Sequence, residues 1–323
     1  MKIPRSTQEM IPVKHILNDG TFVLDSGEYS KMFAFTDINY TELRDEEKMR
    51  RLVDYSALLN SIDKGIYAKI SIFFRPIRQE QFERDVLIPM NPEDELDDYR
   101  ENMNTVLREQ VRGTLGMTKQ AYLTITAGRR NDEDAAAFFA RVEGNLISSF
   151  QALGVELRAV PLSERLRLLH DIYRPGLEET FRYDAHAEKK LGMNWKDSIA
   201  PLSAEALNSC THLKIGGRYC KTLFLNAYPI YLNDRIVSDI ASIGKPMIFT
   251  IDFLPIPSAE AMAEAESRSM AIDTKIVNYT LHQQRNGNYS GSVPYKLMQR
   301  AAGVQEVMEA IPVSYTHLRA HET

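Results

Sequence analysis

The chain has 323 residues, of which 44% are hydrophobic and 26% charged, and its formal net charge is −5. This balance is typical of a globular protein with a real core, and the mild acidity argues against a basic nucleic-acid-binding domain. The cysteine count is two, Cys210 and Cys220, which gives no disulfide framework and suits a reducing compartment. A chain of this length predicts about two domains.

The termini and the hydropathy pattern indicate where the protein works. Residues Met1 to Glu9 lack the apolar stretch of a secretory signal. No run approaches the roughly 18 apolar residues that a membrane span needs. We therefore expect a cytoplasmic protein, which can still join a membrane complex through protein contacts.

The N-terminal part predicts a hairpin, a strand, a helix and a further strand. Two short apolar stretches, Ile11 to Leu17 and Thr21 to Leu24, flank an Asp-Gly turn signal, and Tyr29 to Ile38 follows as a strand. A helix is expected from Asp45 to Gly65. Its expected apolar face consists of Met49, Leu52, Val53, Ser56 and Leu59. Ile66 to Phe74 alternates as a half-buried strand.

The same order of helix and strand then recurs. The expected elements are a polar helix at 92–115, a strand at 120–127, a helix at 132–153, a strand at 155–160 and a helix at 163–173. Asp132 and Ser163 are the expected N-caps, and Gly154 ends the middle helix. We predict an α+β fold, in which β-α-β, ferredoxin-like modules pack helices on one face of a mixed, mostly antiparallel sheet.

The C-terminal part predicts a hairpin, a strand and a helical arm. Residues 211–215 and 219–227 form the expected hairpin around two glycines, and 246–256 is the strand. A long helix begins at Ser258. Its coiled-coil-like seam consists of Met262, Ala265, Ser269, Ile272, Ile276 and Tyr279. Packing within the chain is the simplest role for this seam, and a partner helix is the second.

These patterns predict the domain organisation. The expected parts are an N-terminal α+β domain at 1–175, a β-rich segment at 176–257 and a helical hairpin or linker at 258–312. The last residues, Val313 to Thr323, resemble one translated reading frame of a sequencing adapter. We expect this tail, with His317 and His321, to be non-native, and the natural frame to be interrupted near Pro312.

The loop from Gly216 to Thr222 is similar to the end of a phosphate-binding loop. In a Walker loop a second glycine must precede the Lys-Ser/Thr pair, whereas Cys220 stands before Lys221 here. The residues after it, Leu223 to Asn226, predict a strand, although a phosphate loop should enter a helix. A hairpin turn is therefore the preferred interpretation, and a degenerate phosphate site at Lys221 and Thr222 is the weaker one.

Two groups of residues could hold a metal ion. Cys210, His212 and Cys220 lack the paired Cys-x-x-Cys spacing of zinc sites, so thiols buried in a sheet are the preferred interpretation. The acidic run from Glu93 to Asp98 could bind a cation, but a solvated helix start explains it better.

Two further positions could have a functional role. His170 and Asp171 could form a catalytic dyad, but no nucleophile motif accompanies them, so a surface or capping role is preferred. Trp195 is the single tryptophan, and a core anchor is preferred over a ligand platform. We therefore assign no catalytic, cofactor-binding or metal-binding residue.

Several sequence blocks together resemble a known family. They are Met10 to Lys14, Asp19 to Val23, Tyr29 to Tyr40, Leu153 to Leu157, Pro161 to His170, Ile172 to Pro175 and Lys196 to Leu202, the last with a D-x-I-A-P step. Together they resemble the N-terminal region of VirB/TrbE/CagE-type conjugal-transfer ATPases, the motors of type IV secretion systems, in the branch found on Gram-positive conjugative elements. The resemblance extends over nearly all of residues 10–312.

The resemblance implies a parent motor that hydrolyses ATP to drive pilus assembly and DNA–protein transfer. Such motors continue into a RecA-like domain with Walker A and Walker B motifs, which binds ATP and Mg²⁺. No position of this chain matches those motifs, so no site residue is carried over, and this part is expected to be non-enzymatic. It would be the docking and oligomerisation region, homo-oligomeric in the full-length protein, contacting other secretion subunits at the inner membrane without binding nucleic acid directly.

A second hypothesis remains open beside this one. The chain could be a complete, non-enzymatic scaffold or adaptor that binds partners through the helix from Met262 to Tyr279.

Overall fold

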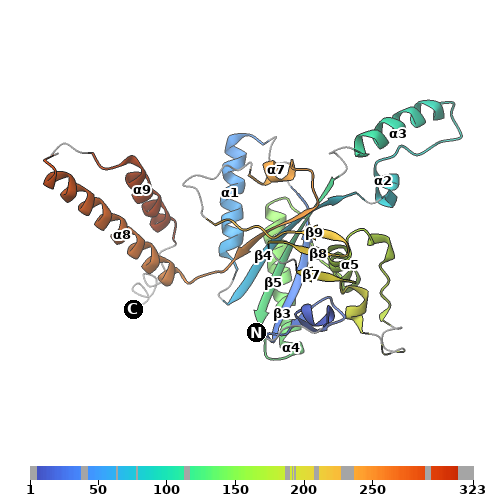
Figure 1. Ribbon diagram of the computed structural model, residues 1–323, viewed down its shortest axis with the longest axis horizontal. Coiled ribbons are helices and arrows are strands. Elements are labelled where there is room, and N and C mark those ends of the chain that lie inside the picture. Colours follow the sequence, from blue (N-terminus) through green and yellow to red (C-terminus); the bar gives the residue numbers. More distant parts are fainter. Residues whose placement is uncertain are drawn as a thin grey trace. The chain divides into compact units, whose positions relative to one another are not determined.

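The computed structural model describes residues 6–37, 43–62, 65–77, 79–112, 117–185, 190, 192, 194–206, 211–226, 236–287 and 292–311. These residues fall into two compact units, one formed by 6–226 with 236–254 and the other by 255–311 (Figure 1). The expected boundary at 257/258 lies close to the observed one, whereas the boundary at 175/176 falls inside the first unit. The expected tail at 313–323 and Cys210 lie outside the described residues.

The first unit is built on one antiparallel sheet. Its strands are β1 (Val13–Ile16), β2 (Phe22–Leu24), β3 (Glu28–Phe35), β4 (Ile66–Pro76), β5 (Met117–Gly128), β6 (Leu157–Ala159) and β10 (Met247–Phe253). Their order is β1-β2-β3-β5-β4-β10, and β6 also pairs with β3. The described pairings of this sheet are antiparallel, which confirms the predicted hairpin at residues 11–24 and the predicted α+β class.

Helices connect these strands in a recognisable order. They are α1 (Asp45–Asn60), α2 (Gln79–Asp85), α3 (Asp97–Arg112), α4 (Asp132–Ala152), α5 (Leu162–Tyr173) and α7 (Ile236–Ala241), with short 3-10 turns at Gln8–Met10, Glu178–Thr180 and Trp195–Ser198. The path β3-α1-β4-β5-α4-β6 with the spatial order β6-β3-β5-β4 is the ferredoxin-like β-α-β-β-α-β arrangement. Helices α2 and α3 are an insertion in the connection between β4 and β5 (Figure 1).

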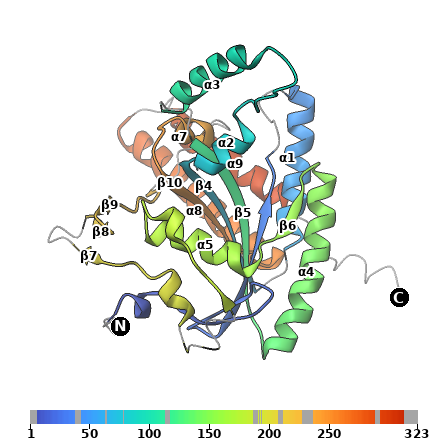
Figure 2. The same ribbon diagram turned by 90° about the vertical axis from the view of Figure 1, so that its right-hand side faces the viewer.

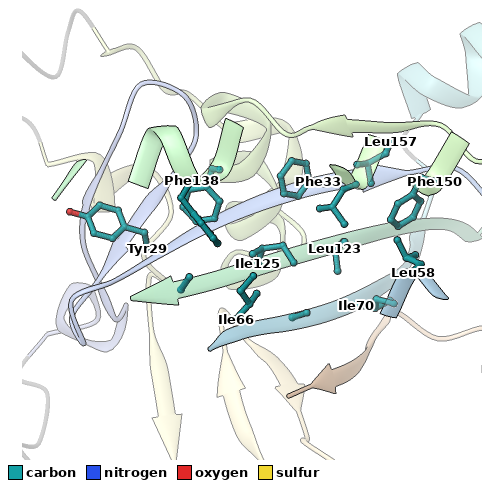
Figure 3. Packing of buried hydrophobic residues seen from close by; sticks show 14 of the residues in the cluster. Tyr29, Phe33, Leu58, Ile66, Ile70, Leu123, Ile125, Phe138, Phe150 and Leu157 are labelled. Atoms are coloured by element: carbon teal, nitrogen blue, oxygen red, sulfur yellow. The ribbon is translucent and has the colours of Figure 1, made fainter. Parts of the chain in front are cut away.

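Helices α1 and α4 cover one face of the sheet. Because side chains alternate along a strand, Phe33 of β3 and Ile125 of β5 point to the same face, where both are almost fully buried. The seam that helical spacing predicts for α4 lies over them, and Phe139 is fully buried. This seam consists of Phe139, Val142, Leu146, Phe150 and Leu153. Figure 3 shows Phe138 and Phe150 of this helix above the strand residues. This contiguous cluster is the main core of the unit.

The expected apolar face of α1 was wrong. Met49, Leu52 and Val53 are 56–63% exposed, whereas Leu58 is 5% exposed and packs into the core with Tyr55 beside it. Helix α1 carries two apolar stripes, and helical spacing alone does not say which of them docks. The tertiary contact decides, because Leu58 meets the α4 cluster and leaves the other stripe outside.

Helix α5 lies on the opposite face, so the expectation of helices on a single face was also wrong. Leu168 of α5 packs with Phe73 of β4, Tyr122 of β5 and Val160. A further cluster joins Leu166 to Phe22 and Ile199. Figure 2 shows α5 on the other side of the sheet from α1 and α4. The sheet is thus a middle layer with a core on each face.

Strand β3 shares one edge between two partners. Its residues Tyr29 and Ser30 pair with β2, while Phe33 to Phe35 pair with β6. The turn before β2 approaches the link between β6 and α5 closely at Gly20, which has φ +83°. A Cβ on Gly20 would lie 2.7 Å from the carbonyl oxygen of Val160, so the junction requires glycine.

A buried arginine of α5 fills this junction. Arg165 is 5% exposed, and it donates to the carbonyl oxygen of Gly20 at 2.9 Å, to that of Ser30 at 2.6 Å and to the Ser30 hydroxyl at 2.8 Å. Its guanidinium stacks 3.8 Å from the centre of the Phe22 ring. Burial lowers the pKa of Arg165 to about 9, and nearby Asp19 partly offsets this, so the group stays charged at neutral pH.

Several element boundaries differ from expectation. Helix α3 begins at Asp97 rather than Pro92, and the first helical residues of α4 and α5 follow Asn131 and Pro161, not the predicted caps Asp132 and Ser163. The Asn131 side chain accepts the Asp134 amide proton at 2.8 Å, so the real cap is the residue next to the predicted one. Helix α2, strand β7 and helix α7 were not predicted.

The second unit is a helical hairpin. It consists of α8 (Ser258–Arg285), which follows Pro257, and α9 (Tyr295–Ala310). Between Met262 and Tyr279 of α8, the six predicted seam residues are the ones that are at least partly shielded from solvent, and Ala265 is 5% exposed. Helices α8 and α9 pack on each other within this unit.

We expect the change Arg165→Met to lower the free energy of unfolding of the first unit by about 3 kcal/mol, because it leaves three buried acceptors without a donor. Arg165→Lys should recover only part of this loss, since an ammonium group lacks the planar fork. Urea unfolding followed by the fluorescence of Trp195 would measure the change. Arg50→Met, at an exposed position of α1, is the control, and an equal effect of both Met variants would contradict the role of the junction.

In the second unit, Ile272→Ser should destabilise the hairpin by about 1 kcal/mol, because a half-buried seam contact is lost. Met270→Ser, at a 63% exposed position of the same helix, should have little effect. Limited proteolysis between α8 and α9 would compare the two variants. Equal cleavage rates would show that the seam contributes nothing to the hairpin.

Candidate functional site

The Gly216 loop closes a β-hairpin. Strands β8 (Leu213–Ile215) and β9 (Arg218–Cys220) are antiparallel, with Ile215 opposite Arg218, and β7 (Ala204–Ala206) pairs with β8. Gly216 and Gly217 have φ +53° and +81°, as a two-residue turn of this hand requires. The hairpin prediction is confirmed, and its glycines form the turn of the hairpin instead of a loop that leads into a helix.

The residues after this hairpin differ from the prediction. The predicted strand continuing through Leu223 is absent, because β9 ends at Cys220 and residues 221–226 have neither helix nor strand. Leu223 and Phe224 are 79% and 83% exposed. Lys221 and Thr222 therefore precede no helix N-terminus in the described residues, and the amide cluster that a phosphate loop provides is missing there.

The thiol and imidazole candidates lie on the same hairpin. The ring of His212 is 5.5 Å from that of Tyr219, and its Nδ1 is 2.9 Å from the Thr211 hydroxyl. Cys220 is a free, half-buried thiol. Among the residues that the structure describes, no three His, Cys, Asp or Glu side chains are grouped as metal ligands would be.

His170 and Asp171 are buried at the end of α5, so the expected surface or capping role was wrong for His170. Its exposure is 0%, and its ring meets Phe181 edge-on at 5.3 Å. Asp171 accepts from the Arg75 guanidinium at 2.6 Å, and Arg75 also donates to Gln120 at 2.6 Å. These contacts tie α5 to strands β4 and β5.

The surroundings of His170 favour a structural role. Its Nδ1 lies 3.6 Å from Asp171, beyond hydrogen-bond length, and its Nε2 lies 3.4 Å from the Thr180 hydroxyl. That hydroxyl donates to the carbonyl oxygen of Leu177 at 2.7 Å, so its proton does not point to the imidazole. Burial lowers the pKa of His170, and the carboxylate of Asp171 opposes this only partly.

The acidic run at 93–98 leads into the first turn of α3. Arg100 donates to Asp94 at 2.5 Å and to Asp97 at 2.7 Å, and the Asp94 carboxylate also accepts the Leu96 amide proton. The Arg100 hydrogen bond is the main cause that lowers the pKa of Asp94 to about 2, and the Leu96 amide adds to it. The arrangement matches the predicted helix start, although the helix begins later than expected.

Trp195 is a core residue, as predicted. It is 8% exposed and lies 6.2 Å from the ring of Phe22, in the cluster that also holds Ile199. It follows Asn194, whose side chain caps the 3-10 turn. Trp195 therefore secures the segment after α5 to the N-terminal hairpin.

The comparisons with known proteins add no assignment. No protein-family model matches the chain, and no curated protein matches it either. None of the helices within the described ranges combines the length and the apolar character that crossing a bilayer requires.

The exposed apolar faces of helices α1 and α3 are the remaining candidates for a functional surface. On α3, Tyr99, Met103 and Val106 are 72%, 53% and 46% exposed. The sequence pattern predicts only a polar helix in this region and does not identify these three apolar residues. Their spacing of four and three residues was the available signal, because it places them on one face. With the exposed stripe of α1, these residues are the candidate surface for contact with another molecule.

We expect the stability of the first unit to fall as the pH drops from 7 to 5. The pKa of His170 is lowered in the folded state, so below about pH 6.5 the unfolded chain takes up the proton more readily than the folded one. His170→Gln should remove this part of the pH dependence. Urea titrations read by Trp195 would test it, with His15→Gln as control at a ring that is 46% exposed. A His170→Gln profile equal to that of the parent protein would contradict it.

Proposed function

We propose that this chain is the N-terminal docking and oligomerisation region of a type IV secretion (conjugation) ATPase. In this proposal the parent motor powers pilus assembly and DNA–protein transfer by ATP hydrolysis. ATP and Mg²⁺ would bind a separate RecA-like domain of that motor. The region itself holds other secretion subunits, and further copies of the motor, at the cytoplasmic face of the membrane.

One observation carries the proposal. The blocks that resemble the family are far apart in sequence but meet in the folded unit. Arg165, in the block at 161–170, bonds to Gly20 and Ser30, which belong to the blocks at 19–23 and 29–40. Ile199, in the block at 196–202, packs on Phe22 in the same region. Resemblance that gathers around one structural junction supports a shared fold better than scattered matches do.

The chemistry of the described residues also supports a docking role. Each cluster that could have been catalytic is engaged in holding the fold: Arg75 with Asp171, Arg100 with Asp94, and Trp195 with its core. The apolar stripes on α1 and α3 face solvent, and faces of this kind on a structured protein are typical of protein interfaces.

One specific observation favours the scaffold hypothesis. The seam residues of α8 are largely shielded from solvent, so a partner helix would have to use another face. Met270, Val277 and Leu281 provide one, since they are 63%, 55% and 46% exposed and recur at intervals of seven and four residues. Substitution of Val277 by Asp would abolish partner binding under the scaffold hypothesis, and it would leave the docking surfaces of the first unit intact.

We expect no saturable binding of ATP–Mg²⁺ by this chain in isothermal titration calorimetry, and no change on Lys221→Ala. The reason is that the Gly216 turn provides no cradle of amide groups for phosphates. Micromolar affinity that the Lys221 change abolished would contradict the proposal and restore the degenerate phosphate site.

Sequencing the natural gene across codon 312 is the complementary test. We expect a Gly-x-x-x-x-Gly-Lys-Ser/Thr motif downstream, between a strand and a helix. A natural stop codon would favour the scaffold hypothesis.

A further inference from the structure

Helix α3 presents an apolar stripe to solvent. Tyr99, Met103 and Val106, which together form the α3 stripe, extend over two helical turns, which is about 10 Å. They are 72%, 53% and 46% exposed, and Leu96 just before the helix is 52% exposed. A helix on a globular protein normally turns such residues inward.

Polar contacts fix the helix in this orientation. Among the side chains of α3 whose burial is described, at 97–110, the buried one is an asparagine. Asn104 is 2% exposed, its Oδ1 accepts the Ile88 amide proton at 2.8 Å, and its Nδ2 donates to the Ile88 carbonyl oxygen at 2.9 Å. At the N-terminal end, Arg100 binds Asp94 and Asp97. Rolling the stripe inward would break these bonds, so its exposure is built into the fold.

The surroundings of the α3 stripe are acidic. Residues 93–112 contain seven carboxylates and three guanidinium groups, a net charge of −4. Asp98 and Glu109 lie on one row along the helix beside the stripe, with Asn102 between them. A ligand of this face therefore needs apolar side chains flanked by positive charge.

These observations distinguish between the kinds of molecule that could bind the α3 stripe. Helices that bind membrane surfaces carry Lys and Arg on their polar face, whereas the acidic border of α3 would be repelled by anionic headgroups. A second copy of α3 would bring like charges together. A basic amphipathic helix satisfies both the apolar and the charge requirement.

We propose that the α3 stripe is the docking site for a partner protein, which binds through a basic amphipathic helix. This rests on the proposed function as a docking region, and it specifies which surface binds and the chemistry of the partner. Apolar side chains of the partner cover Tyr99, Met103 and Val106. Lys or Arg side chains on its flank pair with Asp98 and Glu109, which speeds association and excludes acidic helices.

A peptide assay on the full chain tests the site. The probe is a fluorescein-labelled, 18-residue designed helix with Leu at helical spacing and Lys or Arg at the other positions, and its counterpart has Glu in place of each basic residue. Fluorescence anisotropy at low salt should show saturable binding of the basic peptide and none of the acidic one. Hydrogen exchange should slow in residues 97–112 when the basic peptide binds.

Matched variants distinguish binding at the α3 stripe from non-specific binding of the peptide. Tyr99→Ser with Met103→Ser should weaken binding at least tenfold, and these exposed changes should leave the circular dichroism and the Trp195 fluorescence unchanged. Met49→Ser with Leu52→Ser removes equally exposed residues from α1 and should change the affinity less than twofold. Asp98→Asn with Glu109→Gln, or raising NaCl from 50 to 300 mM, should weaken binding severalfold.

Defined outcomes would overturn the proposal. They are equal binding of both peptides, an equal loss in the α1 control, hydrogen-exchange protection outside α3, or binding of phosphatidylglycerol vesicles that the α3 double variant abolishes. The last result would assign the stripe to a membrane surface. None of them bears on nucleotide binding or on the sequence downstream of codon 312, so failure of this site and failure of the motor assignment are distinguishable.

Discussion

The buried guanidinium of Arg165 is the interaction on which the first unit depends. Strand β3 has one long edge, and two separate segments, β2 and β6, must share it. Where they meet, the Arg165 guanidinium donates to the backbone carbonyl oxygens of Gly20 and Ser30. Its donors form a fixed planar fork, so one side chain reaches both oxygen atoms, whereas the three donors of an ammonium group are not arranged in such a fork.

This junction couples the two faces of the sheet. Arg165 comes from α5, while Ser30, which it binds, belongs to β3, whose other face is packed under α4. Polar contacts in the same layer continue the connection, since Arg75 of β4 joins Asp171 of α5 to Gln120 of β5. Buried polar groups that are hydrogen-bonded on both sides of a sheet favour a single, well-defined packing of the layers.

The same use of polar groups decides which surfaces remain available. Asn104 holds α3 with its polar side inward, and Leu58 directs α1 so that Met49, Leu52 and Val53 stay outside. In both helices the apolar stripe that a single-helix pattern would bury is the one left in solvent. The exposed apolar surfaces of this protein thus arise from how the helices are anchored, and not from unusual sequence composition.

The sequence determined the elements whose pattern is local. Alternation in Ile66 to Phe74, the seams of α4 and α8, the glycine turn at Gly216 and the core role of Trp195 follow from spacing and side-chain type alone. The α+β class and the β-α-β-β-α-β path follow from their order. Tertiary structure alone decided the burial of His170, the face of α1 that packs, the placement of α5 on the second face and the outward stripe of α3. Each of these depends on residues distant in the chain, because a helix with two possible faces docks through the one that its neighbours can satisfy.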